Sequence, residues 1–360
     1  MKDKQLDEML KLDDEKVNIN KKIKKSIHKK IYSRIIIFAV IVSLAIVAVI
    51  KGYAYISQQI YYNPFNEENL IVEKQGQISS DATFQIVLQT WCEIFSPGYG
   101  YYPSHNIQSL GFGNYELKAK FQNLFDHLYI DGSYNASIII NQSKMTIEDF
   151  NNEHYLSRVS YEFLNPSLSK KDTYGKDLFK ISDWTLKEIE KLPESSLLNV
   201  SISFEKPYSL EKTIDFMKQY NQVVFLWMAT DLWDKNDSSI ANGISLFKIS
   251  MYDFNEQAKK EYPYFYIENK DSLTPDILQQ YYLSNIKMIL DHEKEFNMIS
   301  QTTHFMNYDS LKETYKRAQN GFNIAGLRIV INKNDLLKMI KKDNIQYIYI
   351  DDVKLSQLQK

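Results

Sequence analysis

The chain has 360 residues, of which 44% are apolar and 24% are charged. These values are ordinary for a globular protein, and they exclude a mostly disordered chain, a collagen-like fibre and a multi-pass membrane protein. The single cysteine, Cys92, excludes an intramolecular disulfide framework and a cysteine-based zinc site. A reactive thiol is the alternative to an ordinary buried or surface cysteine, and the ordinary residue is the commoner case.

Charge is distributed unevenly, although the formal net charge is only −2. Residues 1–34 have an excess of lysine and arginine, whereas residues 52–360 have an excess of aspartate and glutamate. Only four of the cationic residues are arginine, the side chain that best recognises phosphates and base edges. The composition therefore argues against direct nucleic-acid binding and indicates that the two ends of the chain meet different surroundings.

Residues 35–50 form an uncharged segment whose only polar side chain is Ser43. As a helix it would be about 24 Å long, and its neighbours extend it to the thickness of the hydrocarbon core. We predict one transmembrane helix over residues 32–56, acting as an uncleaved signal anchor. Its predicted membrane flanks are Lys29, Lys30, Arg34 and Lys51. The alternatives are a buried core helix, which would need a polar face, and a cleaved signal peptide, which would need a shorter leader.

The cations next to this segment predict its orientation. Residues 21–34 contain seven cations and no acid. The positive-inside rule then places residues 1–31 in the cytoplasm as a tail and residues 57–360 on the extracytoplasmic side of the cell membrane. The same cations would attract the anionic lipids of the inner leaflet.

The cytoplasmic tail contains a candidate partner-binding site. Leu6, Met9 and Leu10 are spaced at i, i+3 and i+4, and Leu12 lies beside them. Together they form one apolar face of a short helix that would become ordered on a partner. The alternative is a solvated, frayed tail, because so short a helix is not stable alone in water.

After the membrane helix, we predict a membrane-proximal region over residues 57–155 and a C-terminal α+β domain over residues 156–360. The membrane-proximal region should contain a linker at 61–80, helices at 84–95 and 116–129, an aromatic loop at 98–113 and a strand at 136–140. The C-terminal domain should contain strands at 197–204, 223–229, 245–251, 324–331 and 345–350. Its helices should begin near Ser209, Thr274, Ser310 and Asp335, with the second reaching about Glu295.

The sequence contains no local motif of the hydrolases, P-loop proteins, dinucleotide-binding proteins or HExxH metalloproteases. Its six histidines are scattered at positions 28, 105, 127, 154, 292 and 304, so we predict neither a metal site nor a cofactor. Three classes stay open: a regulator, a membrane-anchored extracellular binding or cell-wall-associated protein, and an anchored envelope enzyme whose acids converge only on folding.

A more specific interpretation comes from a strand, a proline-containing turn with a capped helix, and an aromatic strand. They occur in that order in VSISFEKPYSLEKTIDFM (residues 200–217) and VVFLWMATDL (residues 223–232). With the short tail, the basic run and one membrane helix, this layout resembles the membrane-bound sigma factor regulators of low-GC Gram-positive bacteria. The resemblance spans residues 20–115 for the N-terminal domain of that family and residues 170–345 for its C-terminal domain.

The resemblance implies a single-pass anti-sigma factor that regulates transcription during envelope stress and is not an enzyme. Its tail would hold an RNA polymerase sigma factor of the extracytoplasmic-function type at the membrane, and a signal on the outer domain would release it. A second small membrane protein is a further partner that this layout leaves open. The tail differs from the zinc-type anti-sigma tail, because His28 has no cysteine companions.

Overall fold

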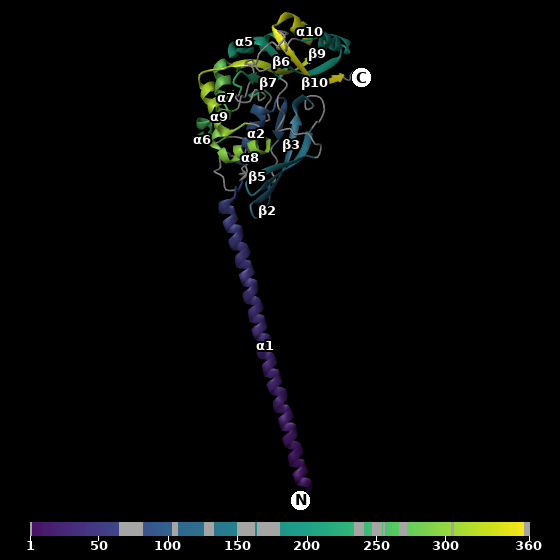
Figure 1. The fold of residues 1–360 in the computed structure, drawn as a ribbon, viewed down its shortest axis with the longest axis vertical. Coiled ribbons are helices and arrows are strands. Elements are labelled where there is room, and N and C mark those ends of the chain that lie inside the picture. Colours follow the sequence, from purple (N-terminus) through teal and green to yellow (C-terminus); the bar gives the residue numbers. More distant parts are fainter. Residues whose placement is uncertain are drawn as a thin grey trace, which may run out of the picture. The chain divides into compact units, whose positions relative to one another are not determined.

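The computed structural model divides the chain into two compact units, Met1–Ile60 and Tyr61–Lys360. Within these units the structure describes residues 2–64, 82–102, 107–125, 133–149, 163, 181–233, 241–246, 254, 256–265, 272–303 and 306–355. The first unit is a single helix, α1 (Lys2–Ile60), and the second contains all the described strands (Figure 1). The mixture of helices and antiparallel sheets confirms the predicted α+β class.

Helix α1 is continuous from the tail through the predicted membrane segment. Residues 2–60 contain no proline, and their one glycine is Gly52. The predicted tail helix and the predicted transmembrane helix are therefore parts of the same element, without an interruption between them.

The described residues of the second unit form two five-stranded antiparallel sheets. The first sheet has the order β1-β3-β4-β5, and β2 pairs with β3. Its strands are β1 (Tyr99–Tyr102), β2 (Ile107–Gly111), β3 (Asn114–Asn123), β4 (Ser133–Asn141) and β5 (Lys144–Asp149). The second sheet has the order β10-β6-β9-β7-β8. Its strands are β6 (Ser196–Ser209), β7 (Val224–Thr230), β8 (Gly243–Ser245), β9 (Asn323–Asn332) and β10 (Ile345–Leu355).

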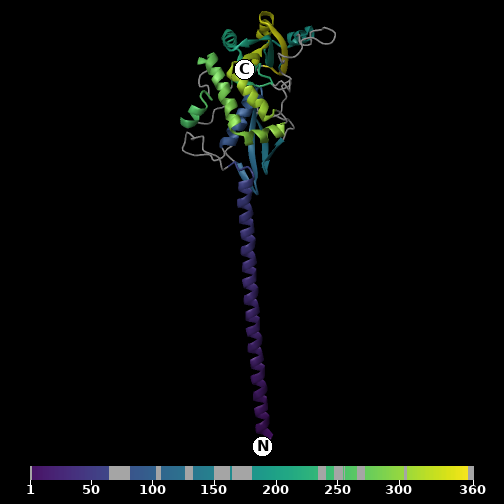
Figure 2. The same ribbon diagram turned by 60° about the vertical axis from the view of Figure 1, so that its left-hand side comes forward.

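The helices of this unit pack around and between the two sheets (Figure 1 and Figure 2). They are α2 (Ala82–Phe95), α4 (Asp183–Lys191), α5 (Leu210–Gln219), α6 (Glu256–Glu261), α7 (Pro275–Asp291), α8 (Glu293–Thr303), α9 (Tyr308–Gln319) and α10 (Lys333–Lys342). Helices α5 and α10 contact β6 and β9, while α8 contacts β5 of the first sheet.

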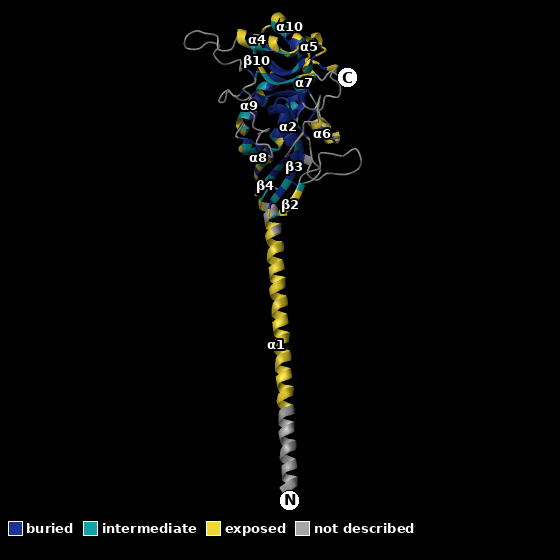
Figure 3. Ribbon diagram, turned by 90° about the vertical axis from the view of Figure 1, so that its right-hand side faces the viewer, coloured by how far each residue is buried: buried dark blue, intermediate teal, exposed yellow. Residues whose placement is uncertain are grey.

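Helix α2 is the predicted helix at 84–95, and it lies at the centre of the unit. Every described side chain from Thr83 to Phe95 is buried, including the polar Gln85, Gln89 and Glu93 (Figure 3). The helix contacts β1 of the first sheet, β8 of the second sheet, and α7 and α8. It is thus enclosed by both sheets and two helices, and its polar residues need partners inside the protein.

The prediction of a helix at 116–129 was wrong, because residues 114–123 form the central strand β3. Leu117 and Phe121 are four residues apart, a spacing that fits both a helix face and alternate positions of a strand. Tyr115 and Ala119 complete the strand pattern, since they are buried on the same face. The predicted aromatic loop at 98–113 likewise contains β1 and β2, which both pair with β3.

The C-terminal elements follow the predictions more closely. Ser209 and Thr274 cap α5 and α7 as predicted, and α9 is followed by Asn320 and Gly321. The predicted start of α9 at Ser310 was wrong: Asn307 is the N-cap, and its Oδ1 accepts the Ser310 N–H at 2.8 Å. An earlier asparagine caps a helix as well as a serine does, so the helix begins there. Helix α7 ends at Asp291 rather than near Glu295, which lies in α8.

The predicted boundary between a membrane-proximal region and a C-terminal domain, at residue 155, lies outside the described residues. On either side of it, residues of both sheets belong to one continuous hydrophobic core. That core includes Trp91 of α2, Ile138 of β4, Ile202 of β6, Ile286 of α7 and Ile329 of β9.

The central pair of the second sheet, β6 and β9, depends on a glycine. A Cβ atom on Gly326 would lie 2.3 Å from the Ile202 carbonyl oxygen and 2.8 Å from the Phe163 ring. We predict that Gly326→Ala destabilises the protein by about 3 kcal/mol or more, because backbone must move in a packed core.

Gly321→Ala is the matched control for this prediction. Gly321 has a positive φ of 93°, but nothing lies within 4 Å of the added carbon. Gly321→Ala should lower the free energy of unfolding by about 1–2 kcal/mol, through backbone strain alone. Urea unfolding of the full chain in detergent, followed by tryptophan fluorescence, measures both values, and equal losses would contradict the steric argument.

Candidate functional site

The apolar part of α1 is exposed along its whole length. From residue 19 onward its described apolar side chains are accessible, from 39% for Val42 to 70% for Val49. The helix is long and apolar enough to cross a membrane, and none of its apolar stretch is buried within the protein (Figure 3). The described helix therefore does not have the burial of a core helix, and it supports a single-pass membrane protein.

The predicted membrane flanks all lie on this helix. Arg34 and Lys51 enclose the uncharged segment and are 17 positions apart, which corresponds to about 26 Å along a helix. Their side chains can extend toward the headgroups on the two sides of the bilayer. Lys29 and Lys30 precede Arg34 by about one turn and add to the positive charge on the tail side.

The predicted partner-binding residues of the tail lie on the helical backbone of α1. Leu6, Met9 and Leu10 therefore share one face by helical periodicity, with Leu12 displaced toward one side of it. Their side chains lie outside the described part of the structure, so their role stays a prediction.

In the second unit, the most deeply buried charge is the guanidinium of Arg328 on β9, whose side chain is 0% exposed. Its Nε donates a hydrogen bond to Asn199 Oδ1 at 3.0 Å, and its Nη2 pairs with Asp351 Oδ2. Asn199 belongs to β6 and Asp351 to β10. One side chain thus links three adjacent strands, with β6 in the middle.

A bulge in β10 places Asp351 for this contact. The β10–β6 pairing shifts between Ile350, which lies opposite Val200, and Asp352, which lies opposite Asn199. Asp351 is the extra residue of this irregularity, and such bulges redirect side chains relative to a regular strand. The ion pair is therefore built by β10, the last strand of the sheet.

The backbone at Gly98 packs against the Arg328 side chain. Gly98 follows α2 and has a φ of 76°, and a Cβ atom there would lie only 2.7 Å from Arg328 Nε. The turn that leads from α2 into β1 therefore packs directly on the buried guanidinium. Through this contact, residues near the start of the unit are coupled to β9 and β10.

A second buried polar group is centred on Glu93 of α2. Its carboxylate accepts hydrogen bonds from Tyr281 Oη at 3.0 Å and from Gln89 Nε2 at 2.9 Å. The Trp227 indole N–H donates to the Glu93 backbone carbonyl at 2.8 Å. Because Tyr281 lies on α7 and Trp227 on β7, Glu93 joins α2 to a helix and to the second sheet. These bonds compensate the cost of burying a polar residue.

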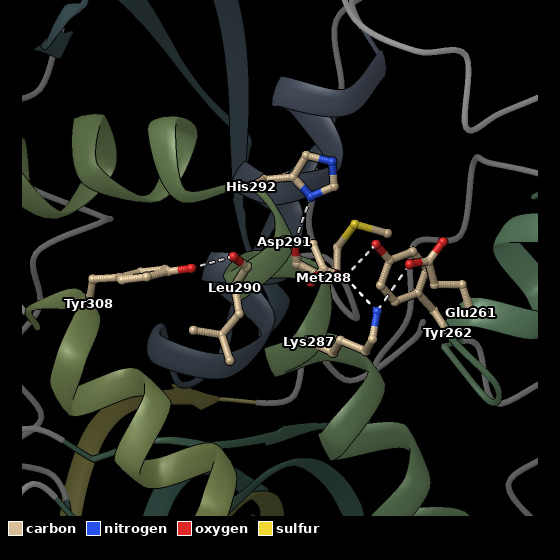
Figure 4. A network of polar contacts seen from close by, with 8 residues as sticks. All are labelled: Glu261, Tyr262, Lys287, Met288, Leu290, Asp291, His292 and Tyr308. Atoms are coloured by element: carbon tan, nitrogen blue, oxygen red, sulfur yellow. Dashed lines mark hydrogen bonds and ion pairs between the residues drawn. The ribbon is translucent and has the colours of Figure 1, made fainter.

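A more exposed polar network holds α6 against α7. Lys287 Nζ lies 3.1 Å from Glu261 Oε1 and 2.6 Å from Asp291 Oδ2, and 4.7 Å from the centre of the Tyr262 ring (Figure 4). Burial lowers the pKa of Lys287, but the hydrogen bonds with Asp291 and Glu261 raise it overall, so the amine stays protonated at neutral pH. Burial and the hydrogen bond to Asp291 also raise the pKa of Tyr262. The network is an anchoring contact with about a third of the lysine exposed, and its stabilising effect is small.

An apolar cleft of about 460 Å³ lies between α5 and β7. Ile214, Met217, Phe225, Leu246 and Leu273 line it, and Lys218 is its one charged residue. The volume is within the range of small-ligand sites. Its lining contains no acid, histidine or cysteine, so the described cleft offers binding surface rather than acid–base chemistry.

Among the described residues, no group of three or more His, Cys, Asp or Glu side chains could hold a metal ion. His28 lies on α1, and the Nδ1 of His292 is 2.7 Å from the Met288 carbonyl (Figure 4). The other four histidines lie outside the described residues. Cys92 is buried, and burial raises the pKa of its thiol. It is therefore an ordinary buried cysteine rather than a reactive thiol.

Comparison with protein families gives one match, over less than half of the chain. Residues 189–352 match the family model described as sigma factor regulator C-terminal. This supports a sigma factor regulator. No curated protein and no solved structure matches the chain. The match lies close to residues 170–345, where the resemblance placed the C-terminal domain, whereas the N-terminal counterpart at 20–115 stays a prediction.

The matched segment, residues 189–352, corresponds to the second sheet. It begins in α4 and ends in β10, so it contains the other four described strands of the second sheet and most of β10. Asn199, Arg328 and Asp351 all fall within it, while Gly98 and Glu93, which contact it, precede it. Sequence reasoning missed the Arg328 cluster, for which the one available signal was an arginine within a strand of apolar residues.

The Arg328 cluster gives a test of stability. Asp351→Asn should lower the free energy of unfolding by about 3–5 kcal/mol, because it leaves the buried guanidinium without a counter-charge. Asp352→Asn is the control. This neighbouring carboxylate accepts the Val353 N–H and has no ion pair among the described residues, so the change should cost less than about 1 kcal/mol. Denaturant titration of the full chain in detergent compares them, and similar losses would show that the ion pair does not lock β10.

Proposed function

We propose that the protein is a membrane-bound anti-sigma factor. The observation that carries the proposal is the regulator match at residues 189–352 in a chain that also has one apolar helix and a basic tail. A sigma factor acts on RNA polymerase in the cytoplasm, so a regulator anchored this way needs a cytoplasmic part. We assign that part to residues 1–31 and the extracytoplasmic side to residues 57–360.

In this proposal the tail sequesters an extracytoplasmic-function sigma factor at the membrane. The face formed by Leu6, Met9 and Leu10 would enter an apolar groove on the sigma factor. The lysines of residues 21–30 would steer an acidic partner toward the tail and would also stay near anionic lipids.

The outer domain would sense the state of the envelope, as in an envelope-stress response of a Gram-positive bacterium. The continuity of α1 supports a mechanical link, since one helix without proline extends from the tail to Ile60. A displacement of its outer end would be transmitted to the tail and would change access to the sigma factor. A second small membrane protein could stabilise either position.

A second candidate is a membrane-anchored extracellular binding protein without sigma activity. The apolar cleft beside α5 favours it, because its size suits a small apolar ligand. The same cleft could also receive the signal in the anti-sigma proposal. An anchored enzyme has less support, because the matched family is one of regulators.

The tail face gives the first test of this function. Leu6→Ala combined with Leu10→Ala should weaken binding of the sigma factor to the full chain by about tenfold or more, because it removes two apolar anchors. Transcription of the sigma regulon should rise accordingly. Glu8→Ala combined with Lys11→Ala changes the opposite helix face and should leave both readouts unchanged. Unaltered sigma binding in the leucine variant would reject the assigned face.

Membrane orientation gives the second test. Alkaline phosphatase fused after Lys360 is active only when exported, so we expect high activity from the wild-type fusion. Replacing Lys29, Lys30 and Arg34 by glutamine should lower that activity, because the positive charge that retains the tail is reduced. The matched control replaces Lys144, Lys187 and Lys191 of the domain. An inactive phosphatase in the wild-type fusion, with the fusion protein present in full amount, would overturn the proposed topology.

A further inference from the structure

The first residues after α1 are held by two turns of the first sheet. Tyr61 packs on the β2–β3 turn, where a Cβ atom on Gly113 would lie 2.9 Å from Tyr61 Cβ. The Tyr62 backbone N–H donates a hydrogen bond to Ser143 Oγ, in the β4–β5 turn, at 2.7 Å. The Tyr62 ring also lies 6.1 Å from the Phe84 ring of α2. The entry of the chain into the second unit is therefore fixed against both turns.

The β2–β3 turn has an unusual conformation and composition. Gly111, Phe112 and Gly113 have successive φ values of 85°, 54° and 75°. Phenylalanine in the left-handed region is strained, and a turn that served only folding would use glycine, asparagine or aspartate there. The Phe112 side chain is 46% exposed, and Leu110 beside it is 52% exposed. The turn thus presents two large apolar side chains to the surroundings.

The position of Tyr61 along the chain, just after the predicted span, links this turn to the bilayer surface. Tyr61 directly follows Ile60, the last residue of α1, and comes five residues after Ile56, the last residue of the predicted span. Five residues of helix cover about 7.5 Å, which is close to the depth of one headgroup layer. Because Tyr61 contacts Gly113, the turn is held within reach of the same layer.

The charges around the β2–β3 turn also suit a position at the bilayer surface. Residues 107–114 contain no charged side chain, and the β4–β5 turn at residues 141–144 contains one cation, the exposed Lys144, and no acid. This contrasts with the acidic excess of the chain after residue 52. An uncharged, apolar tip beside a lysine is suited to a surface with anionic headgroups over an apolar interior.

We propose that Leu110 and Phe112 insert into the interfacial layer of the lipid bilayer. The β2–β3 turn is then a second membrane contact, next to the point where α1 enters the unit. It restrains the second unit against swivelling about a single chain connection. The proposal depends on α1 spanning the membrane, and it holds whether or not the tail binds a sigma factor.

A fluorescent probe at the turn tests the insertion directly. In the full chain reconstituted in phosphatidylcholine–phosphatidylglycerol vesicles, Leu110→Cys is labelled with an environment-sensitive nitrobenzoxadiazole dye. The native Cys92 is buried, and burial raises the pKa of its thiol, so the unchanged chain serves as the blank for labelling. We expect a blue-shifted emission and at least twofold stronger quenching by lipids with a doxyl group near the headgroup than at a control position.

Trp184→Cys supplies the control position. Trp184 is a large apolar residue that is 70% exposed, and it lies on α4, at the end of the unit opposite β2 (Figure 3). Equal quenching at positions 110 and 184 would overturn the proposal.

A second arm keeps the apolar tip intact, because the cysteine at position 110 removes one of its side chains. Gln108→Cys places the dye beside the tip, and its quenching should fall at least twofold when Leu110→Ser and Phe112→Ser are added. Quenching that is absent at Gln108→Cys, or unaffected by the two serines, would show that the tip does not enter the lipid.

Discussion

The complete burial of α2 is the constraint on which the rest of the second unit depends. A helix enclosed on all sides must satisfy its polar side chains internally, and Glu93 does so through Tyr281 and Gln89. The same helix lies between β1 of one sheet and β8 of the other. Both sheets therefore share one core and one central element, and neither sheet could be removed without exposing α2.

The Arg328 cluster extends this coupling across the second sheet. The turn after α2 reaches the guanidinium at Gly98, and the guanidinium in turn pairs with Asp351 on β10. A buried ion pair adds little net stability compared with an apolar core, but its loss leaves an uncompensated charge. The cluster consequently makes the position of β10 depend on that of α2.

The second organising constraint is the membrane, which we propose contacts both α1 and the β2–β3 turn. The apolar stretch of α1 has no polar face, so water is an unfavourable solvent for it. Tyr61 and Tyr62 then fix the start of the second unit to two turns of the first sheet. The first residues of the second unit are thereby packed on that unit's own sheet, which a free linker would not be.

Sequence patterns were sufficient to predict an element wherever its physical cause lies within a few residues. The apolar segment at 35–50, the caps at Ser209 and Thr274, and the apolar strands near 200 and 327 each have a physical cause within a few residues. The same holds for the α+β class and for the resemblance to sigma factor regulators, which the match at 189–352 supports. The tail face at Leu6 depends on local spacing too, although its partner does not.

Tertiary structure decided what local spacing left ambiguous. Leu117 and Phe121 suit a helix or a strand equally, and only the neighbouring strands β1, β2 and β4 select the strand. The burial of α2 on its polar side and the pairing of Arg328 with Asp351 join residues that are distant in sequence. The sequence by itself therefore determined the membrane helix and most element positions, because these follow from hydropathy and capping. The polar clusters and the contacts of Tyr61 were decided by folding, because each needs partners that only the folded chain brings together.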